Sequence, residues 1–180
     1  MSPVPGVAGV RLRPATAADA AALAAIYAPE VLHACASYEL EPPDAAEMAR
    51  RLAAVEACGL PFLVADMAGQ VLGYAYASPF RQRPAYRYTV ENSIYVAAGA
   101  RGRGLGRLLL EALIGRCTAL GYRRMVAVIG DAGNAASVCL HRSLGFAEVG
   151  LLPGAGFKHG RWLDWLMLHR PLGEGDSTPP

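Results

Sequence analysis

The hydrophobic positions of this chain follow two different spacings, and the change from one to the other divides the sequence into strands and helices. Short apolar runs bounded by glycine, proline or other turn residues predict strands. These runs cover residues 10–13, 61–67, 71–80, 89–96, 124–129, 146–152 and 162–168. Segments with apolar residues three or four positions apart, or rich in alanine, predict helices. They cover residues 16–35, 44–59, 105–120 and 134–144.

Residues at the ends of these segments support the same division. Thr16 has the side chain of an N-cap, and Asp44 with Glu47 resembles a capping box. Gly121 and Gly145 follow the last two helical patterns, where glycine commonly ends a helix. The resulting order, β-α-α-β-β-β-α-β-α-β-β, predicts one mixed α/β domain over residues 1–172. Residues 173–180 are expected to form a disordered tail.

Residues 89–106 carry the most informative local pattern, TVENSIYVAAGARGRGLG. A strand with one carboxylate, Glu91, leads through small residues into a glycine-rich turn at residues 101–106. An amphipathic helix follows directly. Backbone N–H groups without obstructing side chains, together with the positive end of the helix dipole, can bind a phosphate.

Neither the glycine-rich turn nor Glu91 decides the function on its own. A glycine turn of this kind is also compatible with a flexible loop or with a small arginine–glycine patch that touches nucleic acid. The spacing does not match the Gly-x-Gly-x-x-Gly or Gly-Lys-Ser/Thr phosphate loops. From its position alone, Glu91 is equally compatible with a general base and with a solvent-facing or salt-bridged carboxylate.

Composition narrows the class of protein. The chain has 180 residues, is 53% hydrophobic and 18% charged, and has a formal net charge of +2. This predicts a folded globular protein and gives no support for nucleic-acid or membrane partners. There is no apolar run long enough to span a bilayer, and the N-terminal residues lack a signal-peptide pattern, so we expect a cytoplasmic protein. The four cysteines form no Cys-x-x-Cys pair, which favours buried reduced thiols, and no metal is expected.

The Arg-x-x-Gly-x-Gly spacing at residues 101–106 closely resembles the pyrophosphate-binding signature of the acetyl-CoA-dependent GNAT N-acetyltransferases. The predicted element order is similar to theirs, which implies a GNAT fold with a mixed, twisted sheet of about 6–7 strands. Four segments narrow the resemblance to the phosphinothricin and methionine sulfone/sulfoximine N-acetyltransferases, over roughly residues 10–172. These segments are RPAYRYTVENSIYV, RGRGLG, VAVIGDAGNAASVCLHRSLGF and GFKHGRWLDW.

The resemblance implies roles for individual residues. It makes Glu91 the general base and His141 a second catalytic residue, which either donates a proton or is structural. The implied acetyl-CoA contacts are Ile94, Tyr95, Val96, Arg101, Gly102, Arg103, Gly104, Leu105, Gly106 and Asn134. The implied substrate contacts are Tyr38, Glu39, Arg81, Arg83 and Tyr86. Arginine suits this task because its guanidinium can hold an oxyanion with two parallel hydrogen bonds.

The expected reaction is acetyl transfer from acetyl-CoA to the α-amino group of phosphinothricin, methionine sulfone or methionine sulfoximine. Two alternatives stay open: an acetyltransferase for protein or peptide amines, and a GNAT fold that binds acyl-CoA without catalysis. The chain departs from the family pattern at Ser143, where a basic residue is common. It departs again at Tyr27–Glu30, where an asparagine commonly follows the aromatic residue. The resemblance also implies a homodimer. The aromatic hairpin at residues 156–165 is equally compatible with a contact to the substrate or the partner subunit and with a hairpin held by a local Arg/Asp pair.

Overall fold

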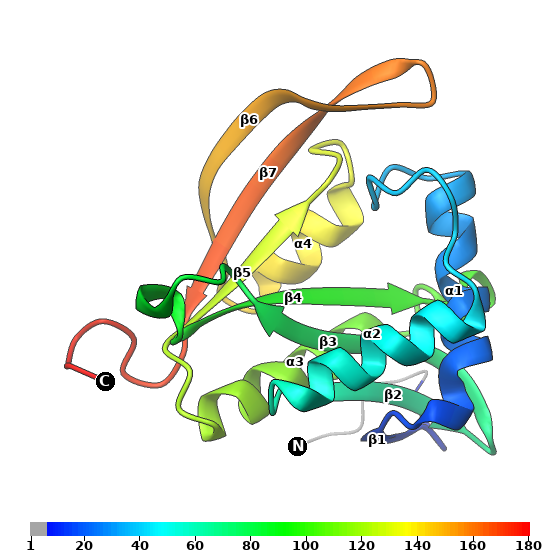
Figure 1. Cartoon of the computed structure of the whole chain (residues 1–180), viewed down its shortest axis with the longest axis horizontal. Coiled ribbons are helices and arrows are strands. Elements are labelled where there is room, and N and C mark those ends of the chain that lie inside the picture. Colours follow the sequence, from blue (N-terminus) through cyan, green and yellow to red (C-terminus); the bar gives the residue numbers. More distant parts are fainter. Residues whose placement is uncertain (1–6) are drawn as a thin grey trace.

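The predicted strands form one sheet in a computed structural model, which describes residues 7–180 (Figure 1). The sheet has seven strands in the order β1-β2-β3-β4-β5-β7-β6. Neighbouring strands are antiparallel except for the central pair β4 and β5, which are parallel. The strands are β1 (Arg11–Pro14), β2 (Phe62–Met67), β3 (Gln70–Pro79), β4 (Thr89–Val96), β5 (Arg124–Ile129), β6 (Ala147–Lys158) and β7 (Arg161–Pro171).

Four helices cover the two faces of the sheet: α1 (Ala20–Leu32), α2 (Ala45–Ala57), α3 (Leu105–Ala119) and α4 (Ala135–Ser143). Tyr74 of β3 packs with Tyr95 of β4 on the side of α1 and α2, where Tyr95 also meets Tyr27. The adjacent Gly73 faces α3, because a Cβ there would lie 3.4 Å from the Leu109 side chain. Successive residues of a strand point to opposite faces, so β3 separates the two helical layers.

The central parallel pair is short. Its register runs from Thr89 opposite Arg124 to Asn92 opposite Ala127, and the strands separate beyond that point. On its other side, β4 stays paired with β3 up to Val96 opposite Gly73. The second half of β4 therefore has one backbone edge that faces no strand.

The connection between the last two strands differs from the prediction. The glycine-rich segment expected to be a loop is strand, so β6 and β7 form a long hairpin with its turn at His159 and Gly160. Register irregularities between Glu148/Gly150 and Leu152/Gly156 absorb the glycines, as β-bulges do. Residues 173–178 form turns, and Asp176 lies 3.0 Å from Arg124.

The first helix and the cysteines also depart from expectation. A 3-10 turn, Ala17–Asp19, follows Thr16, so α1 begins at Ala20 and ends at Leu32. All four cysteines are free, but Cys117 alone is buried; Cys58 and Cys139 are exposed and Cys35 is intermediate. The prediction of four buried thiols was therefore wrong for three of them: Cys139 is exposed on α4, Cys58 follows the end of α2, and Cys35 lies in the loop after α1.

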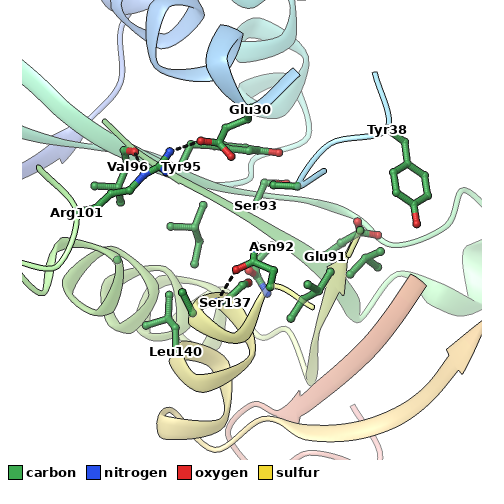
Figure 2. Close-up of a pocket in the computed structure, with 18 of the residues that line it drawn as sticks. Glu30, Tyr38, Glu91, Asn92, Ser93, Tyr95, Val96, Arg101, Ser137 and Leu140 are labelled. Carbon is green, nitrogen blue, oxygen red and sulfur yellow. Dashed lines mark hydrogen bonds and ion pairs between the residues drawn. The ribbon is translucent and has the colours of Figure 1, made fainter. Parts of the chain in front are cut away.

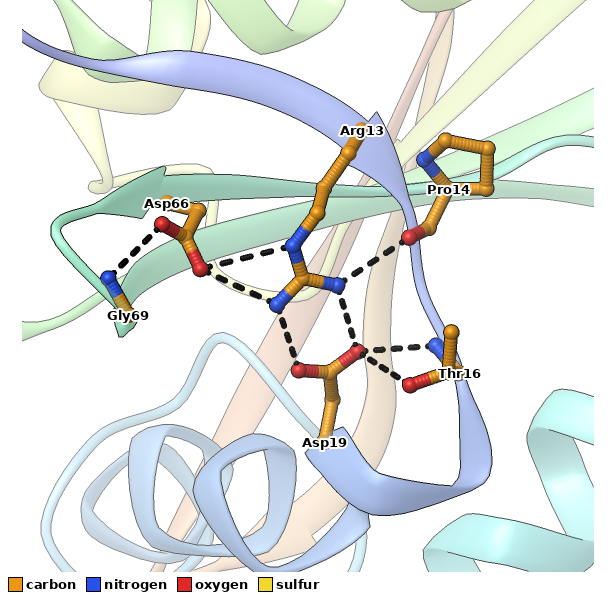
Figure 3. Close-up of polar contacts among 6 residues, drawn as sticks. All are labelled: Arg13, Pro14, Thr16, Asp19, Asp66 and Gly69. Carbon is orange, nitrogen blue, oxygen red and sulfur yellow. Dashed lines mark hydrogen bonds and ion pairs between the residues drawn. The ribbon is translucent and has the colours of Figure 1, made fainter.

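Arg13 ties the edge of the sheet to the start of α1 (Figure 3). Its guanidinium donates to Asp19 at 2.7 and 2.8 Å and to Asp66 of β2 at 3.0 and 3.3 Å. Asp19 also accepts from the Thr16 N–H at 2.8 Å. These bonds favour the charged carboxylate, and the Arg13 guanidinium in particular lowers the pKa of Asp19 to about 2.

We predict that Asp19→Asn destabilises the fold by about 1–2 kcal/mol at pH 7, because the ionised carboxylate is lost. A carboxyl with a lowered folded-state pKa stabilises the protein above its unfolded pKa, about 4, and ceases to do so as pH falls through about 2. Urea unfolding at pH 7 should therefore separate the variant from the parent, and the gap should close near pH 2. Asp44→Asn is the matched control: Asp44 is an exposed N-cap of α2, and asparagine caps equally well. An equal gap at both pH values would contradict the ion-pair explanation.

Candidate active site

A cavity of about 470 Å³ lies where β4 and β5 separate (Figure 2). One wall is the second half of β4, and the opposite wall is the end of β5 with the first turns of α4. The end of α1 and the following loop cover it, and Trp165 of β7 closes one side. Its size is typical of a site for a small molecule or for part of a cofactor.

Glu91 lies on the β4 wall of this cavity and is partly buried. Burial raises the pKa of its carboxyl group, and the positive charge of Arg81 partly opposes that shift. Among residues 7–180, no side chain forms an ion pair with it. Its lone pairs are therefore available to a group that enters the cavity.

The unpaired edge of β4 continues toward a glycine-rich turn. Ile94, Tyr95 and Val96 line the cavity along this edge, so backbone N–H and C=O groups face the space. Such groups are usually paired when buried, and an extended molecule with amide groups could pair them. The edge thus fits the arm of an amide-containing cofactor.

Residues 101–106 place the start of α3 at the end of that edge. Gly102 and Gly104 have φ values of 74° and 86°, which favour glycine, and Gly104 is the residue before the helix. A Cβ on Gly106 would lie 3.2 Å from the Leu140 side chain, so a glycine there lets α3 approach α4. The backbone N–H groups at the start of α3 fit an anionic group such as a pyrophosphate. Arg103 is exposed beside this turn, and Leu105 is buried.

Arg101 and Glu30 form an ion pair across the mouth of the cavity (Figure 2). Arg101 also donates from Nε to the Val96 carbonyl at 3.2 Å. Glu30 belongs to the Tyr27–Glu30 segment that departs from the family pattern. The departure therefore places a carboxylate at the cavity, where a guanidinium neutralises it.

Tyr38 forms a firm wall on the opposite side. Its ring lies against two glycines: a Cβ on Gly156 would come within 2.8 Å of the ring, and one on Gly130 within 3.0 Å. Its hydroxyl donates to the Asp164 carbonyl at 3.0 Å. The loop after α1 is thus fixed to both β5 and the hairpin at this residue.

Several predicted substrate contacts lie elsewhere. Glu39 does not line the cavity; it accepts hydrogen bonds from Arg51 at 2.7 Å and from Tyr27 at 2.9 Å. Arg83 and Tyr86 are exposed on the segment between β3 and β4 and do not line the cavity. Arg81 lies over the Phe80 ring, 4.2 Å from its centre.

His141 lies behind the cavity wall and not in it. It is 5% exposed, and its ring is edge-on to Phe146. Its Nε2 is 3.0 Å from Oδ1 of Asn92, which does line the cavity. Asn134 lines the cavity as predicted, and its side chain caps α4 by accepting from the Ser137 N–H at 3.1 Å.

The sequence analysis did not identify several lining residues. Ser137 and Leu140 follow Asn134 at helical spacing, so the signal for one face of α4 was present. Ser93 lies two positions after Glu91 and hence on the same side of β4. The sequence carries no such signal for Val128, Ile129 and Gly130. They line the cavity only because β5 separates from β4 before it reaches them.

The part of the chain that the structure describes contains no group of three or more His, Cys, Asp or Glu side chains arranged to hold a metal ion. In the same residues, no helix has the length and apolar character needed to cross a membrane.

Comparison with known proteins identifies the fold. The model of the acetyltransferase (GNAT) domain matches residues 12–167. The chain belongs to the GNAT family. It is an acetyl-CoA-dependent N-acetyltransferase, and the predicted GNAT fold is confirmed.

Three of the similar proteins are named for the acetylation of phosphinothricin or of methionine sulfoximine and methionine sulfone. A phosphinothricin N-acetyltransferase from Alcaligenes faecalis is 49% identical over 90% of this chain and 82% of its own. An L-methionine sulfoximine/L-methionine sulfone acetyltransferase from Pseudomonas paraeruginosa is 44% identical over 93% of this chain and 98% of its own. A crystal structure of a phosphinothricin acetyltransferase from Sinorhizobium meliloti in complex with AcCoA has a TM-score of 0.92 and 53% identity, over 96% of this chain and 93% of that one.

Proposed function

We propose that this acetyltransferase transfers the acetyl group to the α-amino group of phosphinothricin, methionine sulfone or methionine sulfoximine, with Glu91 as the general base. The amine attacks the thioester of acetyl-CoA directly. One observation carries the proposal: a partly buried carboxylate without an ion-pair partner in the described residues lies at the point where the β4 edge enters the cavity.

The chemistry explains the need for such a group. An α-amino group has a pKa of about 8, so most of it is protonated at pH 7 and cannot attack. Burial raises the pKa of Glu91, which makes its carboxylate a better proton acceptor for this amine. His141 contributes to the same reaction from behind Asn92, the residue that follows Glu91 on β4.

The cofactor contacts follow from the same geometry. The β4 edge at Ile94–Val96 would pair with the amide-containing arm of acetyl-CoA, and the turn at residues 101–106 would hold its pyrophosphate. Asn134, at the start of α4, would lie beside this arm, and Arg101 would exchange Glu30 for a phosphate of the cofactor.

The proposed substrate class is supported by the names of similar proteins and by the arginine side chains near Glu91. Both curated relatives described above are named for amino acid analogues that carry a carboxylate. Arg81 lies close enough to Glu91 to affect its pKa, and Arg83 follows on the same exposed segment. A bound amino acid would draw these exposed side chains toward its acidic groups while its amine faces Glu91.

We also propose a homodimer that uses the outer face of the β6–β7 hairpin. Five large apolar side chains of the hairpin are at least half exposed: Val149, Leu151, Leu152, Phe157 and Trp162. Phe157 and Trp162 are opposite each other in the register, so these two share the outer face. Trp162, at 68% exposed, packs edge-on against Phe157. Aromatic clusters of this kind are typical of interface centres, and a two-fold contact would bury the same patch on both subunits.

The proposed reaction predicts that incubation with acetyl-CoA and each of the three amino acid analogues yields the N-acetyl product, detected by mass spectrometry. A panel of ordinary amino acids and an N-terminal peptide amine provides the comparison. Turnover of the peptide amine, with no product from any of the three analogues, would rule out the proposed substrate class.

Glu91→Gln should keep acetyl-CoA affinity but lower kcat by about 10²–10⁴-fold at neutral pH, because the amide cannot accept the proton. The defect should shrink as pH rises, since the free amine then forms without help. Steady-state kinetics from pH 6 to 9 test this. Glu56→Gln, at an exposed position on α2, is the matched control and should behave like the parent. Full activity of Glu91→Gln at neutral pH would make the carboxylate structural.

Trp162→Asp should weaken self-association by at least about tenfold, because each two-fold contact loses two aromatic anchors and gains two buried charges. Light scattering over a range of micromolar concentrations measures the change. Leu120→Asp is the control, since Leu120 is similarly exposed but lies at the end of α3. A parent protein that is monomeric at these concentrations, with full activity, would contradict the dimer.

A further inference from the structure

The point at which β4 and β5 separate is held by a side chain. Asn92 is the last residue of β4 in register with β5, and its Nδ2 donates to the Val126 carbonyl of β5 at 3.0 Å. The side chain is therefore an additional bond between the two strands at the place where their backbones diverge. Asn92 is 6% exposed and lines the cavity.

His141 of α4 holds this asparagine from the other side. Its Nε2 lies 3.0 Å from Oδ1 of Asn92, and its Nδ1 lies 2.8 Å from the Ser137 carbonyl. Phe146 packs edge-on against the imidazole, with ring centres 5.0 Å apart. The ring is thus fixed on three sides, and none of them is the cavity.

The hydrogen-bond partners determine where the protons are. The Val126 carbonyl can only accept, so the NH₂ of Asn92 points to β5 and its oxygen points to His141. The imidazole must then carry a proton on Nε2 to bond this oxygen. The Ser137 carbonyl beside Nδ1 also only accepts, so both hydrogen bonds form together only when each ring nitrogen carries a proton, and both protons are then directed at fixed protein acceptors. Neither nitrogen is presented to a thiolate in the cavity.

The location of Asn92 gives this bond a consequence for catalysis. Asn92 follows Glu91 directly on β4, so a movement of Asn92 also moves the proposed base. It also marks the start of the unpaired β4 edge that would hold the cofactor arm. A displacement of about 1 Å between reacting groups can cost about 10²-fold in rate.

We infer that Asn92 and His141 form a positioning pair, in which His141 orients Asn92 and Asn92 fixes both the separation point of β4 and β5 and the placement of Glu91. In this arrangement His141 does not give its proton to the leaving thiolate. The inference rests on the proposed role of the cavity in acetyl transfer.

Substitutions can separate positioning from proton donation. His141→Ala and Asn92→Ala should each lower kcat by about 10–100-fold and also raise the KM for acetyl-CoA, because the cofactor edge moves. The double variant should be little worse than either single one, since both remove the same link. His141→Gln should recover most of the activity that His141→Ala loses, because its amide N–H can still donate to Asn92. His33→Ala, at an exposed histidine after α1, is the control.

The opposite pattern would overturn the inference. If His141→Gln is as impaired as His141→Ala while Asn92→Ala keeps its kcat, the imidazole acts as an acid. Thermal unfolding of each variant separates a loss of folded protein from a change in KM.

A second measurement does not depend on turnover. The ¹⁵N chemical shifts of the His141 imidazole should show a protonated Nε2 in the parent protein and a change of that signal in Asn92→Ala. A bare Nε2 in the parent would overturn the pair. If the proton is on Nε2 but no amine is acetylated, the proposed function fails and the hydrogen-bond assignment stands.

Discussion

The early end of the parallel pairing between β4 and β5 is the constraint on which the rest of the site depends. Beyond Asn92 and Ala127, the β4 backbone has polar groups on one edge that face a cavity instead of a strand. Buried backbone groups without partners are costly, so this edge is suited to a ligand that supplies amides of its own. The antiparallel pairing with β3 keeps β4 straight and fixed while its other edge stays open. The start of α3 then lies at one end of the edge and Glu91 at the other.

The carboxylates in and around the cavity differ in whether they have an ion-pair partner. Glu30 is paired with Arg101, Glu39 with Arg51, and Asp131 with Arg161 at 2.8 Å. Glu91 is the exception among these, and its pKa is raised while those of Glu39 and Asp131 are lowered. A carboxylate with a raised pKa and free lone pairs is less stable but more basic. This contrast supports Glu91 as the base more strongly than its position in the sequence does.

Local patterns predicted the order of the strands and helices, whereas several contacts between distant segments were not predicted. The apolar run at residues 124–129 has the bounds of β5, and the helix predicted from Leu105 begins there. The burial of His141 and the pairing of Glu39 with Arg51 could not be predicted, because they depend on how distant elements meet. Arg13 and Asp66 are 53 positions apart, and nothing near either residue indicates their bond. The glycine-rich hairpin was predicted wrongly for a different reason. Its local composition favours a loop, but pairing between β6 and β7 makes the segment a strand.

The two faces of the β6–β7 hairpin connect the cavity wall formed by Tyr38 with the proposed dimer surface. Gly156 and Lys158 face inward, and Phe157 between them faces outward, as the alternation of a strand requires. Lys158 is 3% exposed and donates to the Ser37 carbonyl at 2.7 Å, next to Tyr38. Burial lowers the pKa of Lys158, because desolvation disfavours its charged form. The hydrogen bond that holds the Ser37–Tyr38 loop is therefore made at the expense of this desolvation. The inner face of the hairpin packs against Tyr38, and its outer face exposes Trp162. A second subunit packed on the outer face would therefore also make the Tyr38 wall of the cavity more rigid.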